Sequence, residues 1–238
     1  MKFSDVNQSE AKKLLNLHPV ALLPIGAVEV HGDHLPLATD DYLAQSVAEL
    51  VDQKLENSIL MPPINYGQVW SLRDFPGSVT VSDDTLAHLI ADIGESLFQH
   101  GAAKLAVINS HVGNCNAIKQ ATRILYDRCD LKTYSFTYPG AESVIRKVCT
   151  AKRPHKVYFH ACEIETSYML YLCEDHVDMT KAVANYPVFP PDFDVSPSPW
   201  SKVLKTAVMG DATAATREKG KAIIDAVVKN IVSIINHS

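Results

Sequence analysis

The chain has 238 residues, 47% of them hydrophobic, which suits a single α/β domain spanning residues 1–238. Its 22 Lys and Arg against 27 Asp and Glu give a net charge of −5, which argues against nucleic acid or an anionic membrane as partner, because phosphate binding needs clustered positive charge. The five cysteines form no CxxC pair, the N-terminus is too polar for a signal peptide, and no apolar run approaches ~18 residues. We therefore expect a cytoplasmic protein with reduced thiols.

Short apolar runs alternate with longer segments in which apolar residues recur every three or four positions, so the pattern predicts strands and helices in turn. The expected strands are Val20–Ile25, 58–61, Lys104–Asn109 and 131–136. The expected helices are 9–17 with Ser9 as candidate cap, 40–55, 83–101, one through Ile118 and Leu125, 141–150, one beginning near Glu163 and Glu165, and 214–236. This alternation predicts an α/β fold with a largely parallel sheet and helices on both faces.

The segment after the first strand concentrates ionisable side chains: Glu29, His31, Asp33, His34, Asp40 and Asp41. Ligands of α/β proteins bind at the carboxyl ends of strands. Glu29 and His31 point the same way if the segment is extended, and Asp40 joins them if residues 32–36 turn back. One Glu, one His and one Asp suit zinc or another divalent first-row metal. The alternative is a solvated surface loop, and for Asp41 we favour a cap or solvated role.

Two further segments carry similar chemistry. His111 directly follows the strand Lys104–Asn109, so it repeats the placement of the first cluster and becomes a candidate ligand rather than a structural histidine. Residues 160–167 supply His160, Glu163 and Glu165 at the start of an otherwise apolar helix. The helix dipole alone favours acidic residues there, so capping is a serious alternative for Glu163, whereas Glu165 is harder to explain that way.

Loops carry the candidate substrate contacts. Residues 62–82 form a loop-rich segment with Trp70, Arg73 and the turn Pro76–Gly77, and binding groups commonly lie on such loops. The alternative is that these side chains form a local core for the loop itself. Residues 186–201 contain five prolines and are expected to form a surface excursion.

Five motifs resemble the creatininase (creatinine amidohydrolase) family, in the family's order and over most of the chain. They are EVHGDHLPLATD at 29–40, FPGS at 75–78, NSHVGN at 109–114, HACEIETS at 160–167 and GDATAATREKG at 210–220, which are similar to the family's ExHGxHLPxxTD, FPGT, NGHGGN, HAGExETS and GDPxxATxEKG. The resemblance implies a three-layer α/β/α sandwich, a homo-oligomer, often a hexamer, and a metal centre that hydrolyses C–N bonds of amides.

Carried over by position, the resemblance implies two divalent ions per subunit, of Zn, Mn or Fe. Glu29, Asp40 and His111 would hold one ion, and His31 and Asp40 a second, with Asp40 bridging. His160 matches the family's proton-transfer histidine. Asn114 of the NSHVGN motif joins Trp70 and Arg73 as an expected substrate contact.

This chain departs from creatininase proper at Gly113, where a glutamate helps to hold the second metal. Glu165 is the candidate replacement ligand and a candidate catalytic group, with Glu163 as the second choice. Ser110, Val112 and Cys162 also stand where the family usually has glycine. The family includes formamide deformylases and peptidases, so the resemblance leaves the substrate open.

The resulting hypothesis is a hydrolase that uses a metal-activated water to cleave an amide, cyclic amide or formamide C–N bond, other than a peptide bond, in a small molecule. A dinuclear phosphoesterase is an alternative, because two metals bridged by an Asp also suit phosphoryl transfer. It is disfavoured by the lack of a Gly-rich phosphate loop and of an Arg/Lys cluster beside the motifs. A catalytically silent, metal-binding regulatory protein is the third reading, kept open by Gly113 and Cys162.

Overall fold

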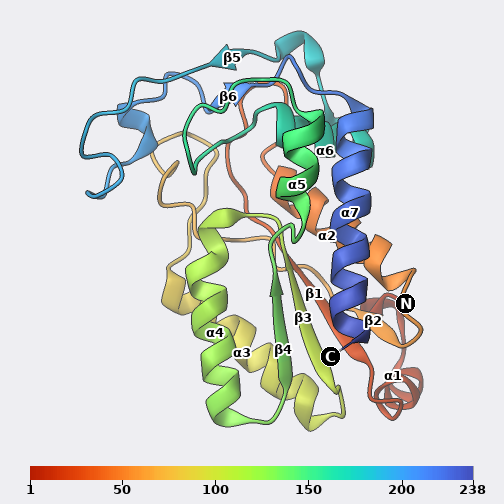
Figure 1. Ribbon diagram of the computed structural model, residues 1–238. Coiled ribbons are helices and arrows are strands. Elements are labelled where there is room, and N and C mark those ends of the chain that lie inside the picture. Colours follow the sequence, from red (N-terminus) through yellow and green to blue (C-terminus); the bar gives the residue numbers. More distant parts are fainter. Residues whose placement is uncertain (238) are drawn as a thin grey trace.

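Four parallel strands form the central sheet of the computed structural model, which describes residues 1–237 (Figure 1). They are β1 (Val20–Ile25), β2 (Ser58–Leu60), β3 (Lys104–Asn109) and β4 (Lys132–Phe136), in the order β2-β1-β3-β4. Val20 at the start of β1 is in register with Ser58 of β2 and Lys104 of β3. The two central strands are apolar runs because helices bury both of their faces.

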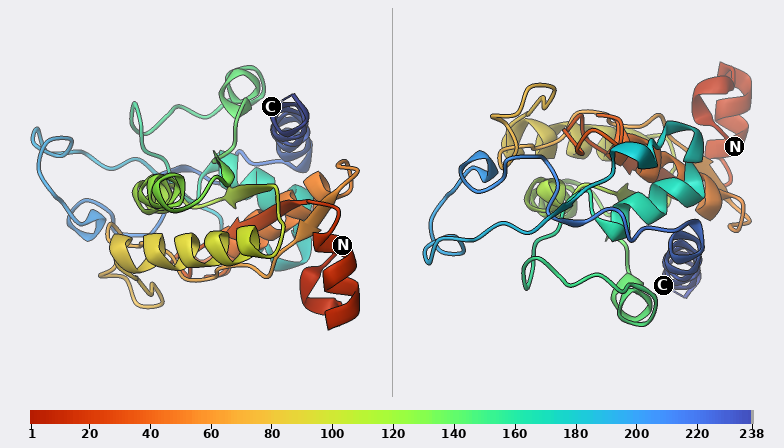
Figure 2. Two further views of the ribbon diagram at one scale, coloured as in Figure 1. Left: turned by 90° about the horizontal axis from the view of Figure 1, so that it is seen from below. Right: turned by 90° about the horizontal axis from the view of Figure 1, so that it is seen from above.

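Helices cover both faces of the sheet and make two apolar cores, so the expected three-layer arrangement is confirmed (Figure 2). Alternate residues of β1 serve different cores: Leu22 contributes to one, while Leu23 and Ile25 contribute to the other. The first core includes residues of α2 (Thr39–Asp52), α5 (Ala141–Val148), α6 (Glu163–Leu172) and α7 (Arg217–Asn236). The second includes residues of α3 (Asp83–Gln99) and α4 (Cys115–Arg128).

Helix boundaries follow capping side chains that the periodicity does not reveal. Helix α1 (Gln8–Leu15) begins one residue earlier than expected, and its cap is Asn7 rather than Ser9, with Glu10 completing a reciprocal capping box. Helix α7 begins at Arg217 rather than at 214, because the side chain of Thr216 accepts a hydrogen bond from the backbone N–H of Lys219.

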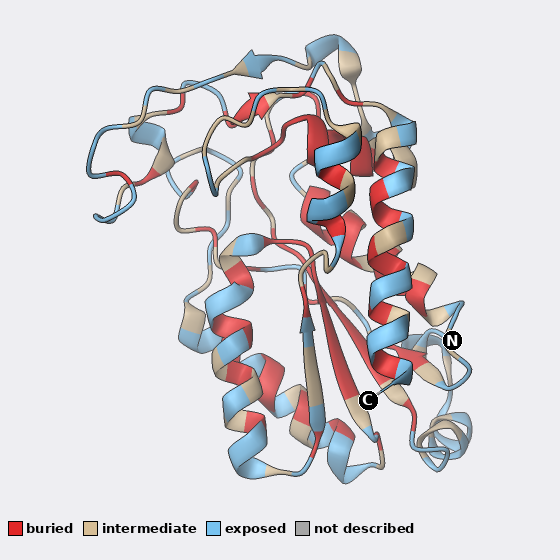
Figure 3. Cartoon of the chain, in the orientation of Figure 1, coloured by how far each residue is buried: buried red, intermediate tan, exposed pale blue. Residues whose placement is uncertain are grey.

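Long irregular segments lie above the carboxyl ends of the strands (Figure 1). They include residues 149–162, the short antiparallel pair of β5 (Ala184–Asn185) and β6 (Gly210–Asp211), and the 3₁₀ turn η5 (Trp200–Lys202) in the long segment between these two strands. A third apolar cluster, with Val69, Leu72 and Met209 at its centre, packs these segments together. Figure 3 shows that burial continues from β1 and β3 into the loops beyond their ends. No helix within residues 1–237 combines the length and apolar character needed to cross a membrane.

Candidate metal centre

Six ionisable side chains gather beyond the carboxyl ends of β1 and β3, each no more than 9% exposed. They come from the segment after β1, the first turn of α2, the segment after β3, and the start of α6 with the residues before it. The six are Glu29, His31, Asp40, His111, His160 and Glu165. Because charged groups are rarely buried without partners, this concentration indicates a functional site.

The backbone turns back on itself between His31 and Asp40, as the cluster requires. Gly32 adopts φ 69°, a left-handed conformation that favours glycine, and the backbone N–H of Glu29 donates to the carbonyl of Leu37 at 3.0 Å. Helix α2 then begins at Thr39, which places the Asp40 carboxylate in its first turn. The strand end and the helix start thereby face the same centre.

Asp40 lies between two imidazoles. Its Oδ2 is 3.1 Å from Nδ1 of His111, and its Oδ1 is 3.6 Å from Nε2 of His31. Glu29 Oε2 lies 3.4 Å from the same His111 nitrogen and 3.9 Å from Nδ1 of His160. Glu165 completes the cluster, since one of its oxygens lies within 4.8 Å of ligand atoms of His31 and Asp40.

Each histidine is oriented by a backbone carbonyl on its outer side. His111 Nε2 donates to Gln68 O at 2.7 Å, His31 Nδ1 donates to Glu29 O at 3.1 Å, and His160 Nε2 donates to Val30 O at 2.7 Å. Since a carbonyl only accepts, each bonded nitrogen carries hydrogen and the other nitrogen faces the cluster. Metal-binding histidines are commonly oriented this way.

The ligand atoms form three groups, each closely enough spaced to share an ion. They are Glu29–Asp40–His111, His31–Asp40–Glu165 and Glu29–His31–His160. Asp40 belongs to the first two, so one carboxylate stands between two potential ion positions. Carboxylate and imidazole ligands in such groups suit Zn²⁺, Mn²⁺ or Fe²⁺.

Polar atoms without partners test whether a cation fits. Within residues 1–237, His31 Nε2 and Asp40 Oδ2 are buried and have no hydrogen-bond partner. Buried polar atoms without partners are rare and costly, and an imidazole nitrogen beside a carboxylate oxygen is a typical pair of metal ligands. The residues present therefore fit a divalent ion.

Proton affinities in the cluster are strongly perturbed. Burial raises the pKa of Glu29 to about 7 and that of Glu165 to about 7. Burial acts to lower the pKa of His31 and of His111, but the neighbouring carboxylates outweigh it and raise these values to about 9 and about 10. Burial also opposes ionisation of Asp40, yet the two imidazoles hold its pKa well below the usual range. Without metal, the cluster therefore binds extra protons that a cation would displace.

His160 differs from the other two histidines. Burial, followed by the charge of His31, lowers its pKa to about 3, so its imidazole is neutral near pH 7. Its ring lies 4.3 Å from that of His31, centroid to centroid, and its backbone pairs with Met209. The residue after it, Ala161, has φ 47° and donates its N–H to Glu165. His160 thus presents a neutral, unprotonated Nδ1 to the cluster.

Comparison with known proteins identifies the family. Residues 4–235 match the family described as Creatininase, creatinine amidohydrolase. The chain belongs to the creatininase family. It is 27% identical to a creatinine amidohydrolase of Pseudomonas putida (91% of this chain, 88% of that protein) and 27% identical to a mycofactocin precursor peptide peptidase of Mycolicibacterium smegmatis (92% and 85%).

Solved creatininases share the fold over nearly the whole chain. A mutant creatininase of Zn–Zn type and a creatininase with Mn give TM-scores of 0.85 and 0.84, each at 28% identity and covering 99% of this chain and 97% of theirs. The expected creatininase-like α/β fold is therefore confirmed.

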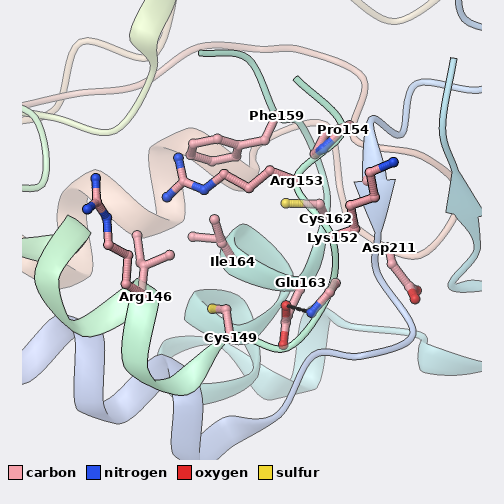
Figure 4. Close-up of a pocket in the computed structure, with 13 residues that line it drawn as sticks. Arg146, Cys149, Lys152, Arg153, Pro154, Phe159, Cys162, Glu163, Ile164 and Asp211 are labelled. Carbon is pink, nitrogen blue, oxygen red and sulfur yellow. Dashed lines mark hydrogen bonds between the residues drawn. The ribbon is translucent and has the colours of Figure 1, made fainter. Parts of the chain in front are cut away.

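Glu163 and Glu165, the two glutamates considered as a replacement for the one missing at Gly113, point in different directions. Glu165 joins His31 and Asp40, as described above. Glu163 accepts hydrogen bonds from the backbone N–H groups of Thr150 and Ala151 and from Lys219 Nζ. Glu163 lines a separate cavity of about 190 Å³ together with Cys149 and Cys162. Figure 4 shows these three side chains. Glu163 therefore fastens the start of α6 to the preceding loop.

Asn114, expected to contact substrate, has a different environment. It is fully buried, its amide nitrogen donates to Gly26 O at 2.9 Å, and its amide oxygen accepts from Gln68 N at 2.9 Å. Its side chain therefore ties together the loops that carry the metal-site residues, and a contact with substrate stays a prediction. Trp70 is half-buried and Arg73 is exposed, with its guanidinium carbon 4.6 Å from the Trp70 ring centroid, so both remain available to a ligand.

Asp41 is neither a cap nor solvated, contrary to the expectation. It is buried, its Oδ1 has no hydrogen-bond partner within residues 1–237, and no side chain caps α2. Burial, followed by the charge of Asp40, raises the pKa of Asp41 to about 8. This side chain therefore belongs to the buried surroundings of the metal centre.

Two residues near the centre were not among the site residues predicted from the sequence. Tyr138 follows β4, and its hydroxyl is buried without a hydrogen-bond partner within residues 1–237. Burial first, and then the charges of Asp40 and Glu165, raise its pKa well above the ordinary value. Tyr138 could have been predicted from its position at the carboxyl end of β4, by the same argument that predicted the residues after β1 and β3. Trp200 lies edge-on to His160, but its irregular Pro-rich segment has no periodicity that places it.

Proposed function

We propose that this protein is a divalent-metal-dependent hydrolase that cleaves a C–N bond of an amide, cyclic amide or formamide in a small molecule. The observation that carries the proposal is the position of Asp40, which is shared by two closely spaced ligand groups in a buried cluster. The family description and the relative named creatinine amidohydrolase support a hydrolase of this type.

Two ions per subunit are proposed. Glu29, Asp40 and His111 would hold one, and His31, Asp40 and Glu165 would hold the other, with Glu165 in the place of the glutamate that the chain lacks at Gly113. Divalent ions in such a site lower the pKa of a coordinated water to about 7 and polarise an amide carbonyl. The solved creatininases of Zn–Zn type and with Mn support a divalent metal.

His160 is the proposed proton carrier. Its neutral Nδ1 faces Glu29 at the edge of the cluster, while Nε2 is held by Val30 O. In this position it accepts a proton from the attacking water and returns it to the nitrogen of the leaving amine as the C–N bond breaks. Proton transfer of this kind contributes typically about 10²–10⁴-fold to the rate.

The proposed substrate bond, an amide other than a peptide bond, has one alternative. We propose an amide other than a peptide bond, but one relative is named a precursor peptide peptidase, so peptides belong in the substrate panel. The homo-oligomeric state, with a hexamer favoured, and the cytoplasmic location stay predictions, to be measured by sedimentation of the metal-loaded protein and by fractionation of the source cells.

The experiment combines metal analysis with a substrate panel. Metal-depleted protein is reloaded with Zn²⁺, Mn²⁺ or Fe²⁺ and assayed for amine release from creatinine, other cyclic amides, formamides and short peptides. We expect Asp40→Asn to lose bound metal and turnover together, while Asp33→Asn, an exposed residue of the same motif, keeps both. A loaded protein that cleaves no C–N bond, or an Asp40→Asn variant that keeps its metal and its rate, would overturn the proposal.

A further inference from the structure

A cavity of about 190 Å³ lies among α5, the loop at 149–162, the start of α6 and β6 (Figure 4). None of its described lining residues belongs to the ligand groups of the metal centre. Its walls are fastened to one another, since Glu163 at the start of α6 accepts hydrogen bonds from the backbone N–H groups of Thr150 and Ala151 in the loop. The cavity is therefore a product of the tertiary fold and separate from the metal centre.

The floor of the cavity is apolar. It is formed by the buried side chains of Ile145 and Ile164, the half-buried ring of Phe159, and the thiols of Cys149 and Cys162. Burial raises the pKa of both thiols, that of Cys149 to about 11. Both thiols are therefore neutral near pH 7 and act as small apolar groups. This floor favours an apolar group over a charged one, because a charge buried there would lose its hydration.

Two arginines stand on one side of this floor (Figure 4). Glu142 on α5 bridges them, since its Oε1 accepts from Arg146 Nε at 2.7 Å and its Oε2 accepts from Arg153 Nη2 at 2.6 Å. A guanidinium has five N–H donors, so each arginine keeps donors beyond the one that Glu142 uses. One carboxylate between two guanidinium groups also leaves an excess of positive charge. The bridge thus holds two cationic groups in place with donors that an anion can use.

The two carboxylates of the described lining already have partners. Glu163 is paired with Lys219 Nζ at 2.5 Å, besides its bonds to the loop. Asp211 Oδ1 accepts from the backbone N–H of Thr213 at 2.9 Å and from its hydroxyl at 2.6 Å, and Figure 4 shows this side chain directed away from the apolar floor. Lys152 is an exposed third cation of the lining. The charge that a ligand meets in this cavity is therefore positive.

We propose that this cavity is a second ligand site, which binds a small organic carboxylate with a compact apolar body. The apolar body would lie against Ile145, Phe159 and Ile164. The carboxylate would be bound by Arg146 and Arg153, because planar guanidinium groups match carboxylate geometry. The volume is sufficient, since an apolar cavity of about 150 Å³ admits benzene. The inference does not rest on the proposed hydrolysis, because the cavity uses none of the residues assigned to that reaction.

Three probes separate the contributions of charge and apolar surface. Benzoate carries both a ring and a carboxylate, acetophenone keeps the ring and a carbonyl but has no charge, and acetate lacks the ring. In calorimetric titrations of the metal-loaded protein, the Kd of benzoate should be at least about tenfold below that of either other probe, because only benzoate combines apolar burial with charge-assisted hydrogen bonds. Metal-free protein should bind benzoate with a similar Kd, since no described lining residue is a proposed metal ligand.

Variants then locate the binding. Arg146→Gln and Arg153→Gln should each weaken benzoate binding by about tenfold or more and leave acetophenone binding unchanged. Arg128→Gln is the matched control, because Arg128 also pairs with carboxylates and its side chain is 39% exposed against 37% for Arg153, but it lies on α4. Benzoate should raise the unfolding temperature of the wild type and of Arg128→Gln, and much less that of the other two variants.

The outcomes are distinct from those of the amide assays. Equal Kd values for benzoate and acetophenone would overturn the carboxylate site, as would benzoate binding that requires the metal or persists unchanged in both Arg146→Gln and Arg153→Gln. The Arg146 side chain is 76% exposed, so its variant keeps the test decisive even if Arg153→Gln fails to fold. A protein that binds benzoate as expected but hydrolyses no amide supports this site and overturns only the proposed function.

Discussion

Gly113 lies so close to His111 that a β-carbon at position 113 would overlap the imidazole ring and the carbonyl oxygen of Gln68. The same carbonyl accepts the hydrogen bond that orients His111. The loop after β3 therefore closes tightly over the histidine and leaves no room for a glutamate at this position. The proposed second ion site takes its glutamate from α6 instead, as Glu165.

Substitution at Gly113 should destabilise the protein. Gly113→Ala is expected to cost about 1–3 kcal/mol of unfolding free energy, because the added methyl group must displace backbone rather than a flexible side chain. Urea unfolding of the metal-free protein measures it. Val112→Ala, at a neighbouring exposed residue, is the matched control and should stay within about 0.5 kcal/mol of wild type. A stable Gly113→Ala variant would show that the loop relaxes easily.

The two glutamates of α6 should separate metal binding from stability. Glu165→Gln is expected to reduce the metal bound per chain, because its carboxylate faces His31 and Asp40. Glu163→Gln should keep the metal but lose about 2–4 kcal/mol of stability, since Glu163 is 2% exposed and Lys219 would lose its anionic partner. Elemental analysis and urea unfolding of both variants test this contrast. Loss of metal from Glu163→Gln, together with full metal content in Glu165→Gln, would assign the metal-binding role to Glu163.

His160→Ala should keep the bound metal and slow turnover by about 10²–10⁴-fold, because the variant removes the proton carrier but none of the three ligands in either proposed ion site. The comparison is kcat on a verified substrate together with metal content. Loss of metal from this variant would instead assign His160 as a ligand, through its grouping with Glu29 and His31.

Metal affinity should rise with pH. In the metal-free protein, His31 and His111 have pKa values of about 9 and about 10, so both carry protons near pH 7 that must leave before they bind a cation. Each ion displaces one histidine proton, so each metal affinity rises by up to about tenfold per pH unit between roughly pH 7 and 9. Zn²⁺ titrations in buffers of different ionisation enthalpy count the protons. A metal affinity that does not depend on pH in this range would contradict the raised pKa values of His31 and His111.

The stability of the metal-free protein should change in the opposite direction. A histidine whose pKa is raised on folding stabilises the folded state fully below its unfolded pKa of about 6.5, and this contribution is lost as the pH rises through the folded value. For His31 and His111 the loss falls between about pH 6.5 and 10. Thermal unfolding at pH 6, 7.5 and 9 measures it. Metal-loaded protein should not show the decline.

The sequence predicted the residues at the strand ends because parallel strands place their carboxyl ends at one edge of the sheet. Glu29, His31 and His111 follow β1 and β3 directly, and the short return to Asp40 needed one left-handed glycine. The same rule, applied to β4, would have led to Tyr138.

Other features depend on packing between distant segments, which local patterns do not encode. Asn114 and Trp70 both lie near the site. The Asn114 amide is occupied by hydrogen bonds to backbone groups, whereas the Trp70 side chain lines a groove at the surface. Asp41 stands beside Asp40 in the sequence, but its burial follows from close contact with Gly26. Trp200 reaches His160 through an irregular segment fastened to residue 71, and no periodicity indicates that contact.

The proposed metal ligands come from the segments after β1 and β3 and from α2 and α6, whereas Phe193 and Trp200 belong to a single Pro-rich surface stretch. Substitutions in that stretch leave every proposed ligand untouched. This surface stretch, which contacts His160 through Trp200, can therefore change in sequence while both proposed ion sites keep their side chains.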